Sequence, residues 1–226
     1  VMPSHQFPTG VVMPVGRRQE LLKWAVEAPD RYIIEDDYDS EFRYRGKPIP
    51  ALQGMDRSGR VIYIGTFSKC IAPAIRVSDL VLPTHLLLRY RSQTSFYAST
   101  VSRIDQNILY QFLAGGYFER HLNRMRAVYK TKHDLLLEQI EPLRERFEIR
   151  GEHAGIHILL TSRQGESEEQ LIQKAEEAGV KVYGLSSYFI HPQHNHRPAT
   201  VVLGYASLSE EQIVEGIRLL MECWGA

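Results

Sequence analysis

Apolar and polar residues follow two different patterns along this chain, and the change between them marks its organisation. Up to about residue 82, short apolar runs end at turn residues, as the run 61–64 does at Gly65. Such runs are typical of buried strands in an α/β domain. From roughly 86 to 140, apolar residues recur at helical spacing, with a break near Gly115 and Gly116. This part of the chain predicts a long helical stretch.

The residues after this stretch predict a small α+β lobe. We expect strands over 147–149, 155–160, 180–183 and 200–205, and helices over 168–178 and 210–223. A capping-box signature precedes each helix, in the pairs Ser167 with Gln170 and Ser209 with Gln212. The sequence therefore divides into an α/β part over 1–85, a connecting helical region over 86–140 and a small α+β domain over 141–226.

The composition is that of a globular chain with balanced charge. Its 226 residues are 43% hydrophobic, which is enough for a sizeable core. Lysine plus arginine number 27, as do aspartate plus glutamate, so we expect no basic surface for nucleic-acid backbones. Cys70 and Cys223 predict no disulfide framework and fit a reducing cytoplasm. The sequence has no apolar run of about 18 residues, the length that predicts a membrane span.

An acidic strand over 32–38 supplies the first candidate chemistry. Alternate side chains of a strand share one face, so we expect Asp36 and Tyr38 on one side and Glu35 and Asp37 on the other. Asp36 is suited to pair with a pyridinium nitrogen, and the Tyr38 hydroxyl to hydrogen-bond a phenolate oxygen beside it. An acidic, solvated strand end is the alternative interpretation.

The loop after the second strand supplies an amine and donors for a phosphate. Thr66, Ser68 and Lys69 follow the strand, and Arg76 comes after a turn at 72–74. A guanidinium fork matches phosphate oxygens, and a partly desolvated lysine beside positive charge is nucleophilic. For Lys69 considered alone, an ordinary exposed lysine is the alternative.

Together these residues predict a pyridoxal phosphate site. That cofactor needs an amine to hold its aldehyde as a Schiff base, an acid at its pyridine nitrogen and donors around its phosphate. The chain offers Lys69, Asp36 and Arg76 for these three tasks. Pyridoxal 5'-phosphate is therefore the expected cofactor.

Three segments carry a resemblance to a known family: 3–10 (PSHQFPTG), 35–42 (EDDYDSEF) and 65–69 (GTFSK). They resemble fold-type I aminotransferases, and within these the aminotransferase-like domain of MocR-type (GabR-like) transcriptional regulators of the GntR family. The likeness runs over essentially the whole chain. Phe7 stands where working aminotransferases carry asparagine, and Asp36-Asp37-Tyr38 is one residue shorter than their Asp-x-x-Tyr pattern. In both features the chain resembles the regulators rather than the working aminotransferases.

The resemblance implies a role for each candidate residue. Lys69 would form the internal aldimine, with Asp36 at the pyridine nitrogen and Tyr38 at the ring oxygen of pyridoxal phosphate. Arg197, just before the strand at 199–205, matches the place where the family carries its arginine for the ligand's carboxylate. The phosphate contacts would come from Arg76 with Thr66 or Ser68.

The chain also departs from the family pattern. Phe7 cannot donate to the cofactor oxygen as asparagine does, so that contact is lost or passes to another group such as His5 or Gln6. Ala74 stands where many relatives have glycine, in the turn before Arg76. The family's winged helix-turn-helix domain and the first part of its large domain are expected outside this chain.

The fold class implied by the resemblance is α/β, like that of fold-type I pyridoxal phosphate-dependent transferases. We expect a partial large domain, then a long helix, then a small α+β C-terminal lobe. A regulator of this kind is a cytoplasmic homodimer that contacts DNA only through its N-terminal winged helix.

Two function classes remain open. In the first, the chain senses an amino compound, which forms an external aldimine while Arg197 grips its carboxylate, and closure of the lobe reorients the attached DNA-binding domains. In the second, the chain is an aminotransferase in which Lys69 also moves the Cα proton. The regulator-like motifs favour sensing, and whether the protein turns over a substrate stays open.

A histidine cluster near the C-terminus raises a separate question. His191, His194 and His196 lie within six residues of one another, but their spacing fits no helical or hairpin pair of metal ligands. A surface loop with titratable histidines is the favoured interpretation, and we expect no metal.

Overall fold

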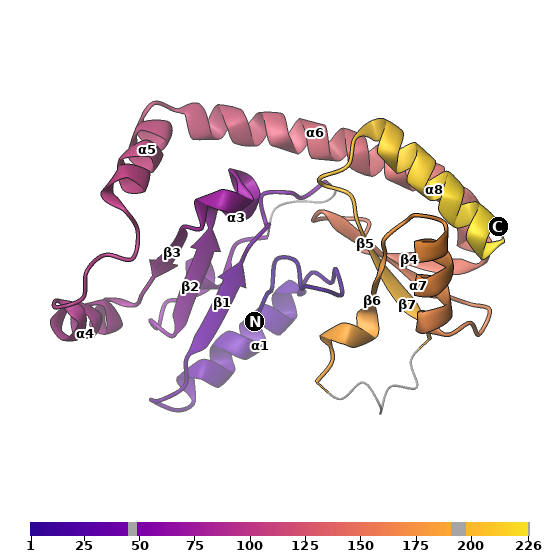
Figure 1. Cartoon of the computed structure of the whole chain (residues 1–226). Helices are drawn as coiled ribbons and strands as arrows, with labels where there is room; N and C mark the ends of the chain where they lie inside the picture. The colour runs from indigo at the N-terminus through magenta and orange to yellow at the C-terminus, as the bar shows by residue number, and fades with distance from the viewer. Residues whose placement is uncertain (45–48, 191–197, 226) are drawn as a thin grey trace. The chain divides into compact units, whose positions relative to one another are not determined.

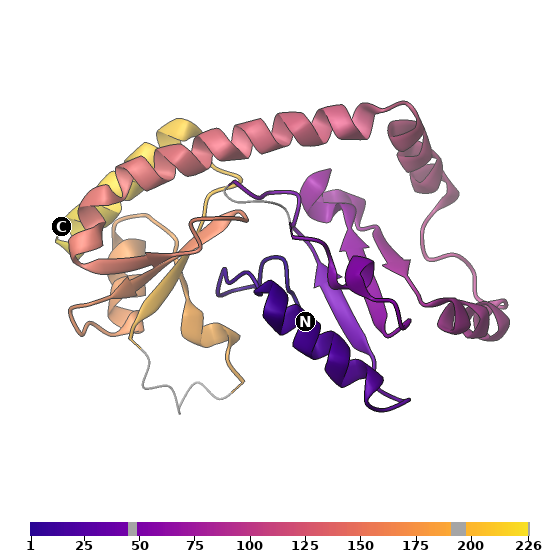
Figure 2. The ribbon, with the colours of Figure 1, turned by 180° about the vertical axis from the view of Figure 1, so that it is seen from behind.

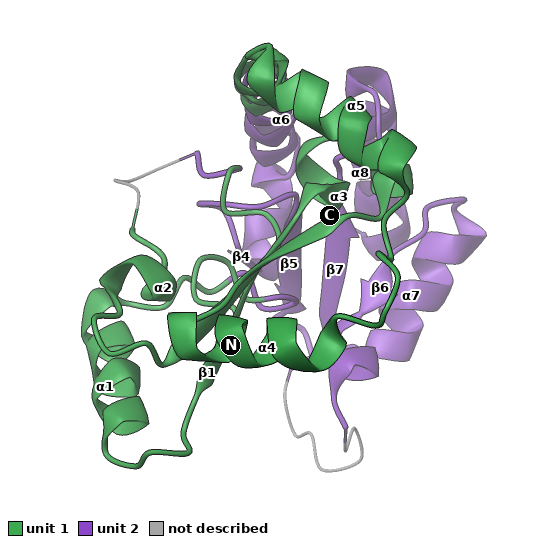
Figure 3. Cartoon of the chain, turned by 90° about the vertical axis from the view of Figure 1, so that its left-hand side faces the viewer, with its two compact units in different colours: residues 1–6, 11–41, 47–126 green, residues 7–10, 42–46, 127–226 purple. Residues whose placement is uncertain are grey.

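The computed structural model describes residues 1–44, 49–190 and 198–225. Within them the chain forms two compact units, which are coloured separately in Figure 3. Unit 1 comprises the described residues of 1–6, 11–41 and 47–126, and unit 2 those of 7–10, 42–46 and 127–226. The chain therefore joins unit 2 briefly at two early points before it stays there. The boundaries expected at 85 and 140 remain a prediction.

A three-stranded sheet forms the centre of unit 1. Its strands are β1 (Ile33–Asp37), β2 (Val61–Thr66) and β3 (Ser78–Val81), in that order across the sheet (Figure 1). β1 runs parallel to β2, with Asp36 opposite Ile64, and β3 runs antiparallel to β2. The two strands expected in this part of the sequence are thereby confirmed.

The two faces of this sheet have different surroundings. Along β1, Ile33, Glu35 and Asp37 are buried, whereas Ile34 and Asp36 are exposed, which confirms the expected alternation. Helix α1 (Val15–Val26) covers the buried face. It faces the viewer in Figure 2, which shows the chain from behind. The small core on this face consists of Ala25, Ile33, Leu52 and Val61.

The buried Glu35 has a structural partner. Its Oε1 accepts a hydrogen bond from the Leu52 backbone nitrogen at 2.8 Å, and its Oε2 accepts one from Gln53 at 2.9 Å. These donors are the first two residues of α2 (Leu52–Met55), whose amide groups have no partner within the helix. Glu35 therefore caps a helix on the face opposite Asp36.

The N-terminal segment of unit 1 is held by a buried arginine. Arg18 is fully buried on α1, and its guanidinium donates to three backbone carbonyl oxygens. The acceptors are Met13 (3.1 Å), Pro50 (2.8 Å) and Pro3 (2.7 Å). Arg18 therefore joins the N-terminal segment, at Pro3 and Met13, to the distant Pro50 and fixes the backbone just before His5.

Three longer helices follow β3. They are α4 (Thr84–Thr94), α5 (Arg103–Ala114) and α6 (Tyr117–Gln139), and the expected break at Gly115 and Gly116 separates the last two. The expectation of helix across 95–102 is wrong. This segment is rich in serine, and Ser102 caps α5 by accepting a hydrogen bond from the Asp105 backbone nitrogen at 3.1 Å. Such side chains favour caps and turns over helix interiors.

Unit 2 contains an antiparallel sheet with the strand order β4-β5-β7-β6. The strands are β4 (Phe147–Arg150), β5 (His157–Ser162), β6 (Tyr183–Gly184) and β7 (Thr200–Gly204). The expected strand over 180–183 is shorter than predicted, because only Tyr183 and Gly184 pair with β7. The helices α7 (Glu168–Glu177) and α8 (Glu210–Trp224) begin with the two predicted capping boxes, at Ser167 and Ser209.

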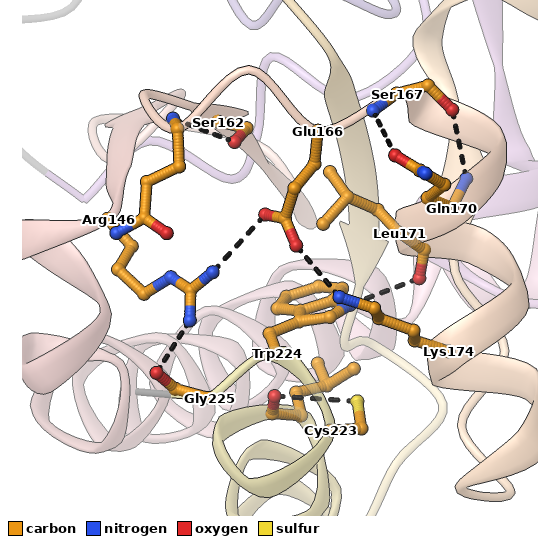
Figure 4. A network of polar contacts seen from close by, with 12 residues as sticks. Arg146, Ser162, Glu166, Ser167, Gln170, Leu171, Lys174, Cys223, Trp224 and Gly225 are labelled. Carbon is orange, nitrogen blue, oxygen red and sulfur yellow. Dashed lines mark hydrogen bonds and ion pairs between the residues drawn. The ribbon is translucent and has the colours of Figure 1, made fainter.

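A network of polar contacts ties the end of α8 to the rest of unit 2 (Figure 4). Arg146 donates to the Gly225 carbonyl oxygen at 2.5 Å and pairs with Glu166 at 3.4 Å, and Glu166 also pairs with Lys174 at 3.0 Å. Inside this network the Trp224 indole, almost fully buried, donates to the Leu171 carbonyl oxygen at 3.0 Å. These contacts close the largest hydrophobic core of the described chain, around Ile158, Leu160 and Val201.

Gly184 on β6 lies against a side chain of α7. A Cβ atom at this position would sit 2.1 Å from Oε1 of Glu168. The Glu168 carboxylate is held there because it accepts hydrogen bonds from the Ser186 backbone nitrogen, at 3.1 and 3.2 Å, and from the Ser186 hydroxyl. Ser186 belongs to the short helix η3 (Leu185–Tyr188), so one carboxylate links α7 to the segment after β6.

No helix in the described part of the chain is both long enough and apolar enough to cross a bilayer.

Candidate functional site

The predicted site residues of unit 1 lie at one edge of its sheet. β1 and β2 are parallel, so their carboxyl ends meet at the same edge, with Asp37 opposite Gly65. Asp36 and Tyr38 stand at the end of β1, and the loop that carries Lys69 begins at the end of β2. In α/β sheets this edge is where ligands bind. The fold therefore brings the acid, the phenol and the amine to a common side of unit 1.

Asp36 is the one acid of the 35–39 run whose side chain is exposed. Its backbone is fixed, because its nitrogen donates to the Val1 carbonyl oxygen at 2.9 Å. Partial burial raises the pKa of Asp36, and the negative charges of Asp37 and Asp39 add to this rise, while the α-amino group of Val1 opposes it. A carboxylate in this position gains from a positively charged partner.

The neighbouring Asp37 is engaged within the unit. Its Oδ2 accepts hydrogen bonds from the Ser40 hydroxyl at 2.8 Å and from the Tyr63 hydroxyl at 3.0 Å. Burial, followed by the charge and hydrogen bond of Asp37, raises the pKa of Tyr63 above its ordinary value. Asp37 is thus part of the framework, and Asp36 is left to face outward.

Tyr38 lies beside a buried histidine–aspartate pair that sequence reasoning did not single out. The Tyr38 hydroxyl is 3.1 Å from Nδ1 of His5, and the same nitrogen is 2.7 Å from Oδ2 of Asp39. His5 and Asp39 are each 1% exposed. Burial raises the pKa of Tyr38, and the charge of Asp39 and a hydrogen bond to its carboxylate raise it further. The phenol therefore remains protonated and is a hydrogen-bond donor at neutral pH.

The loop after β2 gathers three of the predicted phosphate donors. Thr66 caps the single turn α3 (Phe67–Cys70), and its hydroxyl oxygen accepts a hydrogen bond from the Ser68 backbone nitrogen at 3.2 Å. Nη1 of Arg76 donates to the Ser68 hydroxyl at 3.4 Å. Arg76 follows the short helix η1 (Pro73–Ile75), and it is exposed. Two hydroxyl-bearing residues and a guanidinium thus lie together in this loop, and their role at a phosphate stays a prediction.

The backbone of Arg76 adopts an unusual conformation. Its φ of +48° makes it the only residue other than glycine with positive φ among those the structure describes. Left-handed backbone is unfavourable for a residue with a Cβ, and such strain is often found at functional sites. Ala74 leaves the turn intact, and the strain falls on Arg76 itself.

Lys69 lies on α3 and is exposed, whereas the adjacent Cys70 is buried. Burial raises the pKa of the Cys70 thiol to about 11, and the nearby charge of Glu41 contributes to the rise. The thiol therefore stays protonated and packs as an apolar group. The two consecutive side chains point to different surroundings, and only the amine is accessible.

Phe7 belongs to unit 2 and packs there against two rings. Its ring centroid is 5.3 Å from that of His157 and 5.1 Å from that of Tyr188, both in edge-to-face geometry. His157 in turn is 3.0 Å from the Pro8 carbonyl oxygen through Nε2. A phenylalanine at position 7 therefore serves aromatic packing within unit 2, which an asparagine side chain does not provide.

Some predictions fall on residues outside the described ranges. Arg197, the expected carboxylate clamp, is one of them, as are His191, His194 and His196. In the ranges 1–44, 49–190 and 198–225, no group of three or more metal-ligating side chains comes together.

The family of the chain is shown by comparison with known proteins. The chain belongs to the aminotransferase class I and II family, whose model matches residues 2–220. Among curated proteins it is similar to the HTH-type transcriptional regulator YdeL of Bacillus subtilis, with 46% identity over 99% of this chain and 48% of that protein. It is also similar to the probable rhizopine catabolism regulatory protein MocR of Rhizobium meliloti, with 36% identity over 97% of this chain and 44% of that protein.

A solved structure confirms the fold. Kynurenine aminotransferase of Pyrococcus horikoshii, in complex with PMP, KYN and KYA, aligns with a TM-score of 0.85 and 30% identity over 99% of this chain and 55% of that one. The chain spans about half the length of the relatives that it matches. The expected resemblance to the aminotransferase-like part of MocR-type regulators, and the fold-type I class, are both confirmed.

The residues at the sheet edge fit the cofactor that this family generally uses, pyridoxal phosphate. An exposed amine, an exposed carboxylate and a protonated phenol match the aldehyde, the pyridine nitrogen and the ring oxygen. A guanidinium that donates to the Ser68 hydroxyl, with the Thr66 hydroxyl bound to the Ser68 backbone nitrogen, matches a phosphate.

Proposed function

We propose that this chain is the effector-sensing domain of a MocR-type transcriptional regulator and that it binds pyridoxal phosphate through Lys69. The single observation that carries the proposal is the loop after β2. It presents the exposed Lys69 next to a cluster in which Thr66, Ser68 and Arg76 are joined by hydrogen bonds. The neighbouring parallel strand presents Asp36 at the same edge.

In this proposal each group has one task. Lys69 holds the cofactor as a Schiff base, and Asp36 keeps its pyridine nitrogen protonated, so that the ring withdraws electrons. Tyr38 donates to the ring oxygen. Arg76 with Thr66 or Ser68 holds the phosphate. An amino compound then replaces Lys69 as the imine partner, and Arg197 binds its carboxylate.

The sensing function is favoured over turnover by the motifs and by the relatives. Phe7 replaces the asparagine of working aminotransferases, and its ring packs within unit 2. YdeL and MocR, at 46% and 36% identity, bear the names of regulators. In the intact protein, effector binding shifts the population of a closed state, and DNA is contacted through a separate N-terminal winged helix.

A working aminotransferase is the second candidate, because the kynurenine aminotransferase shares the fold at 30% identity. In that case Lys69 also acts as the base that moves the Cα proton. The two functions differ in their products. A sensor keeps the bound amino compound without converting the cofactor, whereas an aminotransferase yields stoichiometric pyridoxamine phosphate in a rapid half-reaction.

A homodimer is part of the proposal, and the surface of unit 1 supports it. Large apolar side chains on and between α4 and α5 are exposed, among them Phe96 (75%), Tyr97 (70%) and Ile104 (73%). Exposed apolar side chains of this kind indicate a surface that is covered in the intact protein, by a second copy in this proposal. Light scattering of the protein in solution, coupled to size exclusion, measures the oligomer directly, and a monomer at micromolar concentration would contradict this part of the proposal.

The test of the proposed function is chemical trapping. The protein is mixed with pyridoxal phosphate, reduced with borohydride and analysed by peptide mass spectrometry. We expect a phosphopyridoxyl adduct on Lys69, accompanied by loss of the visible band. Lys69→Ala should show neither, while Lys23→Ala, which removes an exposed lysine of α1, should behave like the parent. An adduct spread over many lysines, or an unchanged visible band in Lys69→Ala, would refute the assignment.

A second measurement separates sensing from turnover. The protein loaded with cofactor is mixed with a panel of natural amino acids, and pyridoxamine phosphate is quantified over time. We expect a spectral change on binding and slow or absent conversion. Rapid, stoichiometric pyridoxamine phosphate would establish the aminotransferase instead.

A further inference from the structure

A buried histidine–aspartate pair stands directly behind the candidate site. Nδ1 of His5 is 2.7 Å from Oδ2 of Asp39, and both side chains are 1% exposed. Burying two such groups is costly unless their hydrogen bonds are satisfied and their geometry is good. The pair joins the N-terminal segment to the residues after β1, at the point where Tyr38 leaves the strand.

The same nitrogen of His5 is also 3.1 Å from the Tyr38 hydroxyl. A ring nitrogen of histidine carries either one proton or one acceptor lone pair. Carboxylate oxygens accept hydrogen bonds, so we assign the proton of the 2.7 Å contact to Nδ1 of His5. Nδ1 then cannot accept the proton of Tyr38. The phenol proton is donated to the Asp39 carboxylate in this structure.

We propose that His5 and Asp39 form a positioning pair that holds the Tyr38 hydroxyl as a hydrogen-bond donor toward the ring oxygen of the cofactor. The inference rests on the proposed function, in which Tyr38 faces that oxygen. His5 and Tyr38 both donate to the Asp39 carboxylate, and the phenol oxygen lies 3.1 Å from Nδ1 of His5. When an anionic ring oxygen is present, the phenol turns its proton from Asp39 to that oxygen, while His5 still donates to Asp39.

The environment of the trio favours this role over simple packing. Burial and the charge of Asp39, to which Asp36 and Asp37 add, keep the Tyr38 phenol protonated. Phe7 has no polar side-chain atom and packs in unit 2, so it supplies no donor to the cofactor. Arg18 holds the Pro3 carbonyl oxygen at 2.7 Å, which fixes the backbone that carries His5. The residues around this trio therefore favour Tyr38 as the donor to the ring oxygen of the cofactor.

The first experiment addresses the hydrogen-bond assignment without cofactor. The protein is labelled with ¹⁵N at histidine, and the two ring nitrogens of each histidine are distinguished by long-range ¹H–¹⁵N spectra, with His5→Asn used to assign the His5 signals. We expect a proton on Nδ1 of His5. A His5 ring protonated only at Nε2 would overturn the proposal, because Nδ1 would then accept from Tyr38.

The second experiment measures whether His5 acts through Tyr38. A donor to the ring oxygen lowers the proton affinity of the cofactor–lysine linkage, so its loss moves the visible absorbance titration to higher pH. We expect His5→Leu to shift the midpoint upward by about one pH unit, the order of magnitude of one hydrogen bond to a charged oxygen. His5→Asn, which keeps a donor near the position of Nδ1, should restore most of the parent midpoint.

A double-variant cycle distinguishes positioning from a purely structural role. In a Tyr38→Phe background, His5→Leu should produce no further shift, because the group through which it acts is gone. Additive shifts would overturn the proposal. His133→Asn is the matched control, since His133 is equally buried beside Asp134 but lies on α6 in unit 2. If the parent itself shows no cofactor band, the proposed function fails, and the nitrogen spectra still decide the assignment at His5.

Discussion

Nη1 of Arg76 lies 3.4 Å from the Ser68 hydroxyl, and the residue that carries this guanidinium has a left-handed backbone with φ of +48°. The two observations are connected. The chain turns sharply after η1, and the left-handed residue at the end of this turn directs its side chain back to α3. Backbone strain and the proposed phosphate contact therefore coincide at one residue.

The first prediction separates these two properties of Arg76. Arg76→Gly should raise the free energy of unfolding by about 1 kcal/mol, because glycine adopts positive φ without steric cost. It should also weaken pyridoxal phosphate binding by at least about tenfold through loss of a charged hydrogen bond. Arg76→Ala should lose the affinity without gaining stability. Urea unfolding and cofactor titration measure the two effects, and equal stability of both variants would show that the backbone is not strained.

Asp36 gives the second prediction. Asp36→Asn removes the negative charge at the proposed pyridine nitrogen, and we expect cofactor affinity to fall by about tenfold, as for one charge-assisted hydrogen bond. Stability should change by less than about 0.5 kcal/mol, because the side chain is exposed. Asp30→Asn, another exposed acid in the same unit, is the control. Unchanged affinity in Asp36→Asn, measured by titration of the visible band, would remove Asp36 from the site.

Arg18 gives the third prediction, which concerns the framework alone. Arg18→Met removes the Arg18 hydrogen bonds to the Met13, Pro50 and Pro3 carbonyl oxygens, of which only Pro3 keeps another donor in the described part of the chain. We therefore expect a loss of about 2–4 kcal/mol of stability. The adjacent Arg17→Met removes only an exposed ion pair with Glu20 and should cost less than about 1 kcal/mol. Urea unfolding of the two variants, followed by circular dichroism, makes the comparison. Similar midpoints for both would contradict the clamp.

Glu41 gives the fourth prediction, on the dependence of stability on pH. Burial raises the pKa of Glu41 above its ordinary value of 4.5, and the charges of Asp37 and Asp39 add to the rise. The folded state then binds the proton more tightly than the unfolded state, so stability falls as pH rises from about 4.5 through the raised pKa. Glu41→Gln removes this loss.

The Glu41→Gln variant should therefore be more stable than the parent at neutral pH, and the difference should vanish below pH 4.5. Thermal unfolding at a series of pH values measures this difference. Glu138→Gln, which changes an exposed acid on α6, should show no such trend. A constant difference across the pH range would mean that Glu41 acts by packing and not by its charge.

Local patterns in the sequence were sufficient for much of this fold. The alternation along β1 separates Asp36 from Glu35 and Asp37 as expected, because side-chain direction in a strand depends only on position. The capping boxes at Ser167 and Ser209 are equally local, and both are present. The helix expected across 95–102 is not formed, because apolar spacing alone does not register the preference of serine for caps.

The parts of the site that the sequence did not reveal depend on long-range contacts. The His5–Asp39 pair joins residues that are 34 positions apart. Each residue lies in a recognised motif, yet nothing local indicates that they meet. Arg18 reads as an ordinary polar residue of α1, and only the fold surrounds it with the carbonyl oxygens of Pro3 and Pro50. Burial of a charge is a property of the tertiary structure, and a local pattern does not encode it.

The close approach of Gly184 to Glu168 constrains how the sequence can diverge. The space that a side chain at 184 would fill is taken by a carboxylate, and Ser186 holds that carboxylate in place. Evolutionary change at these positions is therefore coupled. A relative with alanine at 184 should either place the carboxylate at 168 away from the residue at 186 or carry a smaller side chain at 168.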